Sequence, residues 1–375
     1  MPIGIDYTPA YEQGGGIGRY VRELVAALAA HDSAQTYHLF VGGARQNKLP
    51  PAPAPNFRYR STRLSPLTLA RLWHRARLPL PVELFVGKVR LFHATDFVLP
   101  PTLPRTRTLL TVHDLSFARL PDSAAPSLRA YLEAVVPRSA RRADHILADS
   151  AATKADLIAL YGIPESKITV LYSGVSEAFK PTHDSAIQSA VRAKYGIGES
   201  PYVLSVGTVQ PRKNYERLMQ AFAALPTRWA DLKLVIVGGR GWLDSPIYAQ
   251  ARALGERVLL TGFAEESDLP ALYSGALCLA FPSLYEGFGL PVLEGMACGV
   301  PVLTSNVSSL PEVAGDAALM IDPHSVEAIR AGLIELLEED SAAHAARIER
   351  GYAQAKRFTW HAAAQQLKAL YERLI

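Results

Sequence analysis

The sequence is poor in several features that mark particular protein classes. It has only two cysteines, Cys278 and Cys298, in 375 residues. Two thiols in apolar surroundings exclude a disulfide framework or a cysteine metal cluster, so we expect buried structural thiols. No apolar run is long enough to span a bilayer, and the N-terminus has no signal-peptide pattern. We therefore expect a cytoplasmic protein.

Motifs for bound metals and for several large enzyme classes are also missing. The sequence contains no Asp-x-Asp, His-x-x-x-His or Cys-x-x-Cys, so we expect neither a metal ion nor another cofactor. It has no Gly-x-Ser-x-Gly elbow and no Walker-type phosphate loop. Any phosphate group must then be bound by arginine, lysine and backbone amides.

Acidic residues are absent from a long stretch near the N-terminus, between Asp32 and Glu83. Residues 66–78 of this stretch fit a short helix with an apolar face and arginines beside it. Such basic amphipathic segments bind anionic membrane surfaces, although an ordinary surface helix has the same pattern. We expect residues 58–78 to contact the membrane, and we expect no nucleic-acid binding because no recognised module accompanies the charge.

Alternating strand and helix patterns fill the chain and restart once, which predicts two α/β domains. A length of 375 residues suits two cores better than one. We place the first domain at 1–180 and the second at 181–358, each a doubly wound parallel sheet. Ligands of such sheets bind beyond the carboxyl ends of the strands, so an inter-domain cleft is expected to hold the functional loops.

Residues 281–304 contain the most informative motif of the sequence. A predicted strand ending at Phe281 leads into a turn with Gly287 and Gly289, and a helix is predicted from about Pro291. A glycine-rich turn before a helix N-terminus presents free backbone N–H groups and the positive end of the helix dipole. This arrangement predicts an anion site, and phosphate is the expected anion.

Two carboxylates, Glu286 and Glu294, flank this turn with seven residues between them. Carboxylates repel phosphate, so they are better suited to accept hydrogen bonds from sugar hydroxyls. A nucleotide sugar offers both the phosphate and the hydroxyl groups. A structural glycine turn with two unrelated glutamates remains the alternative if this segment is considered alone.

Further loops at predicted strand ends suit the same ligand. Gly14–Gly18 is expected to be a flexible loop that approaches a ligand closely. His113 follows an apolar strand, where a core or capping histidine is the alternative to a functional one. Arg212 and Lys213 lie between a strand and a helix and could neutralise a diphosphate leaving group without a metal. Glycines that could admit a base or ribose follow two other strands: Gly238 and Gly262.

These motifs together resemble those of the retaining GT-B glycosyltransferases of family GT4, the glycosyltransferase group 1 proteins. The resemblance covers essentially the whole chain, and Glu286-x7-Glu294 carries it most specifically. It implies a GT-B fold in which a C-terminal helix at about 359–375 packs back on the first domain. The overall appearance is closest to bacterial mannosyltransferases of surface-polysaccharide assembly.

The resemblance also implies roles for individual residues. Glu294 would bind the ribose of the donor and Glu286 the transferred sugar, while Arg212 and Lys213 would hold the diphosphate. His113 would contact the sugar near the reacting carbon. The rest of the donor site would be formed by Gly15, Gly16, Gly207, Gly238, Gly262, Gly287, Phe288, Gly289 and Leu290. Thr208 stands where many relatives have arginine, so one phosphate cation is missing or replaced.

The expected reaction is hexose transfer with retained anomeric configuration and without a metal. The donor would be a nucleoside-diphosphate sugar, and GDP-mannose is the expected one. The acceptor would be a glycan or a lipid-linked acceptor at the inner face of the cell membrane. Three alternatives remain open: a sugar-nucleotide epimerase of the same architecture, an NAD-dependent oxidoreductase, and a non-catalytic sugar-binding protein.

Overall fold

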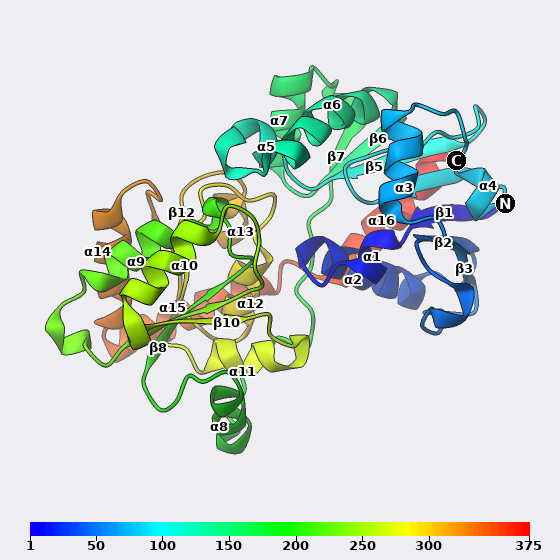
Figure 1. Ribbon diagram of the computed structural model, residues 1–375. Coiled ribbons are helices and arrows are strands. Elements are labelled where there is room, and N and C mark those ends of the chain that lie inside the picture. The colour runs from blue at the N-terminus through cyan, green and yellow to red at the C-terminus, as the bar shows by residue number, and fades with distance from the viewer. The chain divides into compact units, whose positions relative to one another are not determined.

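The computed structural model describes residues 1–375, which form two compact units. Unit 1 comprises Met1–Leu115, Ser127–Gly174 and Thr359–Ile375. Unit 2 comprises Ser116–Pro126 and Val175–Phe358. The C-terminal segment thus belongs to the same unit as the N-terminus, and a short segment after β5 belongs to unit 2. The two units are described separately below (Figure 1).

Unit 1 is built on a sheet of seven parallel strands in the order β3-β2-β1-β4-β5-β6-β7. Because successive strands are added outward on either side of β1, the sheet is doubly wound. Its strands are β1 (Ile3–Asp6), β2 (Tyr37–Gly42), β3 (Phe57–Thr62), β4 (Leu91–Ala94), β5 (Arg107–Val112), β6 (His145–Ala148) and β7 (Ile168–Val170). Its main helices are α1 (Thr8–Glu12), α2 (Gly16–His31), α3 (Pro66–Ala70), α4 (Glu83–Val86), α6 (Pro126–Arg142), α7 (Ala151–Tyr161) and α16 (Trp360–Leu374).

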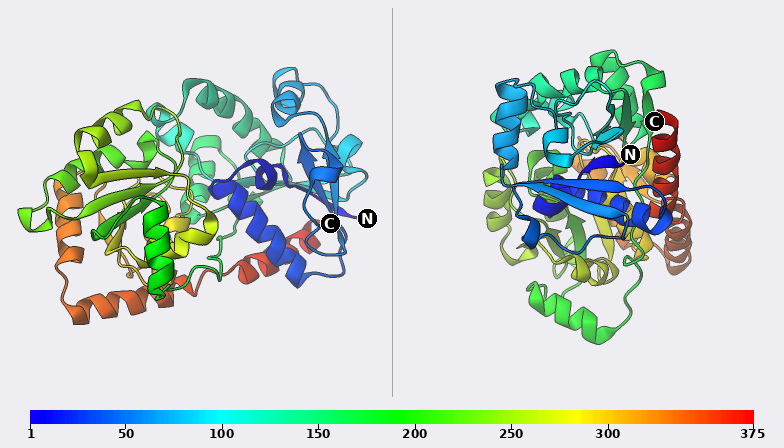
Figure 2. Two further views of the ribbon diagram at one scale, coloured as in Figure 1. Left: turned by 60° about the horizontal axis from the view of Figure 1, so that its bottom comes forward. Right: turned by 90° about the vertical axis from the view of Figure 1, so that its right-hand side faces the viewer.

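The C-terminal helix α16 packs beside α2, as both views of Figure 2 show. Its buried side chains follow one face of the helix, including Leu367, Leu370 and Tyr371. Near its start, the chain passes close to the segment that leaves β7. A Cβ atom added to Gly174 would lie 2.1 Å from the Trp360 nitrogen, so glycine is required at this crossing.

Unit 2 has six parallel strands in the order β10-β9-β8-β11-β12-β13. The strands are β8 (Tyr202–Val206), β9 (Lys233–Val237), β10 (Val258–Gly262), β11 (Cys278–Phe281), β12 (Val302–Ser305) and β13 (Leu319–Ile321). Its helices are α5 (Ser116–Arg119), α8 (Ser185–Lys194), α9 (Tyr215–Ala223), α10 (Ser245–Ala253), α11 (Leu269–Ser274), α12 (Leu290–Ala297), α13 (Leu310–Ala314), α14 (Val326–Leu337) and α15 (Ser341–Ala355).

Two hydrophobic cores lie on the two faces of the unit 2 sheet. Leu204 and Leu279 point into one core, whereas their neighbours Val203 and Ala280 point into the other. This follows from the alternation of side chains along a strand, since a parallel sheet is buried on both faces. Both cysteines are buried and unpaired, as expected.

The predicted fold of two doubly wound α/β domains is confirmed, and the structure differs from the expected elements in local details. The helix expected from about Ile17, after the glycine-rich loop, is α2, which begins at Gly16. The short helix expected over residues 66–78 is a five-residue α-helix followed by a π-helical turn, Arg71–Arg75. The edge strands β3 and β13 and the helices α8 and α10 were not predicted.

Candidate active site

The central site of unit 2 lies at the point where its strand order reverses, between β8 and β11. The loop after β8 contains a single 3-10 turn, Pro211–Lys213, and the loop after β11 contains Glu286. Both loops leave carboxyl ends of adjacent parallel strands, which is where doubly wound sheets bind ligands. Their backbones are joined by a hydrogen bond of 2.9 Å from the Leu284 N–H to the Arg212 carbonyl.

A buried charge cluster joins these two loops. The Arg212 guanidinium donates to one Glu286 carboxylate oxygen at 2.7 Å, and the Lys213 ammonium donates to the other oxygen at 2.7 Å. Arg212 also donates to the Tyr285 carbonyl at 2.6 Å. Glu286 is only 7% exposed. The sequence motifs that suggested these three residues separately therefore meet in one cluster.

The two cations determine the ionisation state of Glu286. Burial alone raises the pKa of this carboxyl group, but the charges of Arg212 and Lys213 outweigh it and lower the pKa to about 2. Glu286 is therefore ionised near neutral pH, and the three side chains carry a net charge of +1. The Lys213 ammonium also lies 4.5 Å from the centre of the Phe281 ring.

Three of the predicted glycines lie at neighbouring strand ends beside this cluster. The N–H of Gly207 donates to Val237 at the end of β9, and the N–H of Gly238 donates to Gly262 at the end of β10. A Cβ atom on Gly238 would lie 1.9 Å from the Gly207 carbonyl oxygen. A Cβ atom on Gly207 would lie 2.9 Å from the Lys213 side chain. These glycines therefore allow three strand ends and Lys213 to pack closely.

The turn that carries Glu286 is fastened by two serines that follow β12. The Glu286 N–H donates to the Ser308 hydroxyl at 2.9 Å, and the Ser309 hydroxyl is 2.9 Å from the Glu286 carbonyl. Ser309 also donates to the Phe288 carbonyl at 2.7 Å. Because the backbone of the turn is held on both sides of Glu286, its carboxylate has a fixed position.

The residues after Glu286 that were predicted to bind the nucleotide sugar differ in how far they are buried in the core. Gly289 precedes α12 with a φ of 122°, a conformation that favours glycine. Gly287 is buried within the same turn. The Phe288 side chain lies in the core and packs edge-to-face on Phe358, so any ligand contact would come from its backbone. Leu290 is half-buried and packs against the same core.

Glu294 lies on α12 and is 2% exposed. One of its carboxylate oxygens accepts a hydrogen bond of 2.7 Å from the hydroxyl of Tyr273, at the end of α11. This partner orients the carboxylate and was not recognised from the sequence. Glu294 and Glu286 are thus each held by different partners.

His113 follows β5 in unit 1 and has two hydrogen-bond partners. Its Nδ1 atom lies 2.7 Å from a carboxylate oxygen of Asp149, and its Nε2 atom lies 2.8 Å from the Thr95 carbonyl oxygen. Burial alone lowers the pKa of His113, but the charge and hydrogen bond of Asp149 raise it to about 9. The ring is therefore protonated near neutral pH.

Gly15 and Gly16 stand at the start of α2, where Gly15 is the N-cap. A Cβ atom on either residue would have no neighbour within 4 Å, and neither has a positive φ. Gly18 differs, since its Cβ atom would lie 1.9 Å from the Gln13 carbonyl. Packing therefore explains the glycine at position 18 but not those at 15 and 16.

The predicted site residues thus separate into groups by unit. In unit 2, Glu286, Arg212 and Lys213 lie together beside Gly207, Gly238 and Gly262, while His113, Gly15 and Gly16 belong to unit 1. Sequence reasoning missed four residues that hold this machinery: Tyr273, Ser308, Ser309 and Asp149. Asp149 offered one signal, because it directly follows a predicted strand, His145–Ala148, as His113 follows another.

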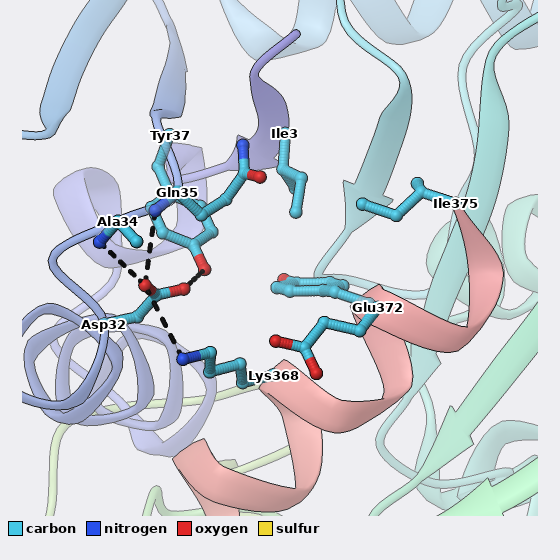
Figure 3. Close-up of a pocket in the computed structure, with 9 residues that line it drawn as sticks. Ile3, Asp32, Ala34, Gln35, Tyr37, Lys368, Glu372 and Ile375 are labelled. Atoms are coloured by element: carbon cyan, nitrogen blue, oxygen red, sulfur yellow. Dashed lines mark hydrogen bonds and ion pairs between the residues drawn. The ribbon is translucent and has the colours of Figure 1, made fainter.

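A polar pocket lies at the opposite edge of the unit 1 sheet, at the amino ends of β1 and β2 (Figure 3). Asp32 lies at its centre and accepts hydrogen bonds from the N–H groups of Ala34 and Gln35 and from the Tyr37 hydroxyl. Lys368 of α16 approaches it to 3.8 Å. These groups are paired with one another, so they link the end of α2 to α16 and leave no unsatisfied polar group among them.

No group of three or more His, Cys, Asp or Glu side chains is arranged to hold a metal ion. None of the helices combines the length and the apolar character needed to cross a bilayer.

Two family descriptions match the two halves of the sequence. Residues 14–179 match "Glycosyltransferase Family 4", and residues 188–354 match "Glycosyl transferases group 1". The O-antigen chain mannosyltransferase B of Escherichia coli is 35% identical over 374 residues, which cover 96% of each chain. The O-antigen chain mannosyltransferase RfbU of Salmonella typhimurium is 30% identical over 66% of this chain and 64% of its own length.

Solved structures show the same fold at lower sequence identity. Sucrose-phosphate synthase from Thermosynechococcus elongatus superposes with a TM-score of 0.77 at 23% identity, covering 100% of this chain and 99% of its own. WaaG, a glycosyltransferase involved in lipopolysaccharide biosynthesis, superposes with a TM-score of 0.73 at 18% identity and 98% coverage of both chains. With these matches over nearly its whole length, the chain belongs to glycosyltransferase family 4, the group 1 glycosyltransferases, and has the GT-B fold.

Proposed function

We propose that this glycosyltransferase moves a hexose from a nucleoside-diphosphate sugar to a hydroxyl of a glycan, with retention of anomeric configuration. The Arg212–Glu286–Lys213 cluster at the switch point of unit 2 is the observation that carries this proposal. Mannose from GDP-mannose is the proposed donor, because the relatives similar over most of this chain include mannosyltransferases of O-antigen chains.

The cluster suits a diphosphate and a sugar in adjacent positions. Arg212 and Lys213 supply two positive charges, and α12 begins soon after the Glu286 turn, which places the positive end of its helix dipole beside that turn. The Glu286 carboxylate would accept hydrogen bonds from hydroxyls of the transferred sugar. Glu294, oriented by Tyr273, would bind the ribose. His113 would contact the transferred sugar, and Gly15 and Gly16 would let the backbone approach the phosphates.

The proposed reaction needs no metal and no cofactor. The bond between the anomeric carbon and the diphosphate oxygen breaks, and its electron pair stays on the diphosphate. Arg212 and Lys213 stabilise this developing charge. The acceptor hydroxyl oxygen bonds to the anomeric carbon on the same face, and its proton passes to the departing diphosphate.

The acceptor is proposed to be a lipid-linked glycan or growing surface polysaccharide at the inner face of the cell membrane. Residues 58–78 support peripheral contact with anionic lipid. Six arginines and three leucines of this basic segment are exposed: Arg58, Arg60, Arg63, Arg71, Arg75, Arg77, Leu64, Leu67 and Leu78. By contrast, Leu69 is buried, and Trp73 donates to the Leu80 carbonyl inside unit 1.

A donor panel tests the proposed function. Thermal stability would be measured with GDP, UDP, ADP, GDP-mannose, UDP-glucose and NAD, with chelator present. Selective stabilisation by GDP and GDP-mannose is expected. Release of GDP from GDP-mannose should then require an added glycan acceptor. Release of an altered nucleotide sugar without acceptor would instead indicate an epimerase, and a response to NAD alone would contradict the proposal.

Two substitutions assign the roles within unit 2. Arg212→Ala should lower kcat by about 100-fold, because a charge that stabilises the leaving group is removed. Glu294→Ala should weaken binding of the nucleoside diphosphate by about 10-fold, through loss of hydrogen bonds to a charged group. Arg228→Ala is the control, because Arg228 is an exposed arginine paired with Glu338. Normal kinetics in both site variants would overturn the assignment.

A further inference from the structure

The hydrogen-bond partners of His113 in unit 1 determine the protonation state of its ring. Contact with a sugar alone would not require this. Both ring nitrogens face acceptors: Asp149 Oδ2 at 2.7 Å from Nδ1 and the Thr95 carbonyl oxygen at 2.8 Å from Nε2. A neutral imidazole has one donor and one acceptor nitrogen. A carbonyl oxygen cannot donate, so Nε2 must carry a proton, and a carboxylate at Nδ1 requires a second one.

We propose that Asp149 is a positioning residue that keeps His113 doubly protonated, so that His113 serves as a fixed positive charge and not as a proton-transfer base. The inference rests on the proposed function for its link to turnover. Its structural basis is the hydrogen bonding of both ring nitrogens within unit 1, and this does not depend on which nucleotide sugar the protein uses.

The other groups around the ring favour the same state. Asp96, which follows β4, is a second carboxylate close enough to favour the charged ring, and its pKa is in turn lowered by His113 although burial raises it overall. A positive charge on His93, which lies on β4, would disfavour the charged state of His113. However, burial together with the charge of His113 lowers the pKa of His93 to about 3. His93 is therefore neutral, with its nitrogens 2.7 Å from the Tyr371 hydroxyl and 2.8 Å from the Thr111 hydroxyl.

Asp149 is a buried carboxylate with few hydrogen-bond donors around it. It is 5% exposed, its Oδ1 atom has no hydrogen-bond partner, and its Oδ2 atom accepts the hydrogen bond from His113. A buried carboxylate with one cationic partner depends on that partner for its charge. Tyr20 and Phe97 pack edge-on against the imidazole at 5.0 and 5.4 Å between ring centres, which fixes its plane.

This arrangement has a consequence for the path of the proton. Because both nitrogens of His113 are already bonded inside unit 1, the ring has no lone pair to accept the proton of an acceptor hydroxyl. That proton must go elsewhere, which agrees with its transfer to the departing diphosphate. A fixed cation near the reacting sugar would instead favour the negative charge that develops on that leaving group.

The experiment is a comparison of the full-length protein with Asp149→Asn and with Glu133→Gln. Glu133 is an exposed carboxylate of unit 1 in an ion pair with Arg129, so Glu133→Gln controls for loss of one negative charge. Nitrogen-15 NMR of histidine-labelled protein reports the protonation of each ring, and His113→Gln identifies the His113 signals. Melting temperatures show which variants are folded.

The wild type and Glu133→Gln should show a doubly protonated His113 ring at pH 7.5, whereas Asp149→Asn should show a neutral one. In Asp149→Asn, kcat at pH 8 should fall about 10- to 100-fold with little change in the donor KM, and should recover partly towards pH 6. Asp149→Glu should restore part of the high-pH activity. Wild-type protein should have a flat kcat over this range.

A neutral His113 ring in the wild type at pH 7.5 would overturn the proposal, whatever the activity. A ring that loses its proton in Asp149→Asn while kcat stays unchanged would overturn the catalytic part and leave His113 a structural ion pair. Failure of the proposed donor would appear as absent turnover in the wild type, while the NMR result would stand unaffected.

Discussion

At the scale of single residues, Glu286 is the most informative position because it pairs with two cations at once. Its carboxylate holds Arg212 and Lys213 within hydrogen-bonding distance, and their charges keep its pKa near 2. The glutamate thus fixes the geometry of the groups proposed to bind the diphosphate, and it also offsets part of their charge. These two effects of Glu286 on an anionic ligand have opposite signs.

Glu286→Gln separates the two effects. Glutamine keeps the size of the side chain but raises the net charge of the cluster from +1 to +2, so a nucleoside diphosphate without sugar should bind about 3- to 10-fold more tightly. Turnover of the nucleotide sugar should fall, because the acceptor for the sugar hydroxyls is weakened. Calorimetry at two salt concentrations measures the first effect, and initial rates measure the second.

The matched control is Glu256→Gln, an exposed carboxylate of unit 2. It changes the net charge equally and should leave both measurements unchanged. If diphosphate affinity in Glu286→Gln stays at the wild-type value or drops, the carboxylate does not compete with phosphate for the two cations.

Tyr273 permits a second test at the same scale. Its hydroxyl donates to Glu294 at 2.7 Å, so Tyr273→Phe should weaken nucleoside-diphosphate binding about 3- to 10-fold by freeing the carboxylate that is proposed to bind ribose. Tyr202→Phe is the control, since that buried hydroxyl donates to the Leu272 carbonyl. Equal affinities in the two variants would show that the hydroxyl of Tyr273 acts only on stability.

At the scale of elements, the sequence predicted the repeated α/β pattern and the position of the main motif but not the supports around it. Glu286 and Arg212 follow apolar runs that are easily recognised as strands, so their places at strand ends could be inferred. Ser308 and Tyr273 act through backbone and hydroxyl contacts set by tertiary packing. No local pattern marks a serine that will receive an N–H from a turn 22 residues away.

The differences between the expected and the observed elements have similar causes. The three consecutive glycines suggested a flexible loop because glycine disfavours helix interiors. The helix expected from about Ile17 is α2, which starts at Gly16, and Gly18 belongs to its first turn because only glycine fits beside the Gln13 carbonyl. The edge strand β3 was missed although Arg58 and Arg60 alternate with less polar residues, as in a half-buried strand, because these arginines were assigned to the basic segment 58–78.

Asp32 joins three elements of unit 1 and supports a prediction about stability. It follows α2, caps the turn into β2 through Ala34 and Gln35, and accepts the Tyr37 hydroxyl. Asp32→Ala should lower the free energy of unfolding by about 1–3 kcal/mol, because buried donors lose their acceptor. Denaturant unfolding followed by tryptophan fluorescence measures it, with the exposed Asp231→Ala as control.

The pH dependence of this effect has a defined sign. Burial raises the pKa of Asp32, but the hydrogen bonds from Tyr37, Gln35 and Ala34 outweigh it, so the pKa is lowered below the ordinary value of 3.8. The folded protein then binds fewer protons than the unfolded chain, and the stabilisation is present above that ordinary value and is lost as the pH falls below it. The wild-type advantage over Asp32→Ala should therefore shrink below pH 3.8. A constant difference would contradict the assignment.

At the scale of the whole molecule, the distribution of charge matters more than its sum. The formal net charge is only +4, yet the segment between Asp32 and Glu83 has no acidic residue. The structure exposes its arginines together with Leu64, Leu67 and Leu78, the last two on either side of the π-helical turn Arg71–Arg75. A basic surface with separate apolar side chains suits an anionic lipid headgroup layer better than a neutral one.

Vesicle binding tests this surface. Replacing Arg63, Arg71 and Arg75 by glutamine should weaken binding to vesicles that contain anionic lipid by about 100-fold, because each arginine near such a surface contributes about 1 kcal/mol. Wild-type binding should also decrease as salt is raised. The control replaces Arg228, Arg252 and Arg330, three exposed arginines of unit 2, and so changes the net charge equally. If both triple variants lose affinity to the same extent, net charge alone drives binding. If only the first does, the exposed arginines of the basic segment are the lipid-binding surface, and Leu67→Ser should then weaken binding further at high salt, where the apolar contribution remains.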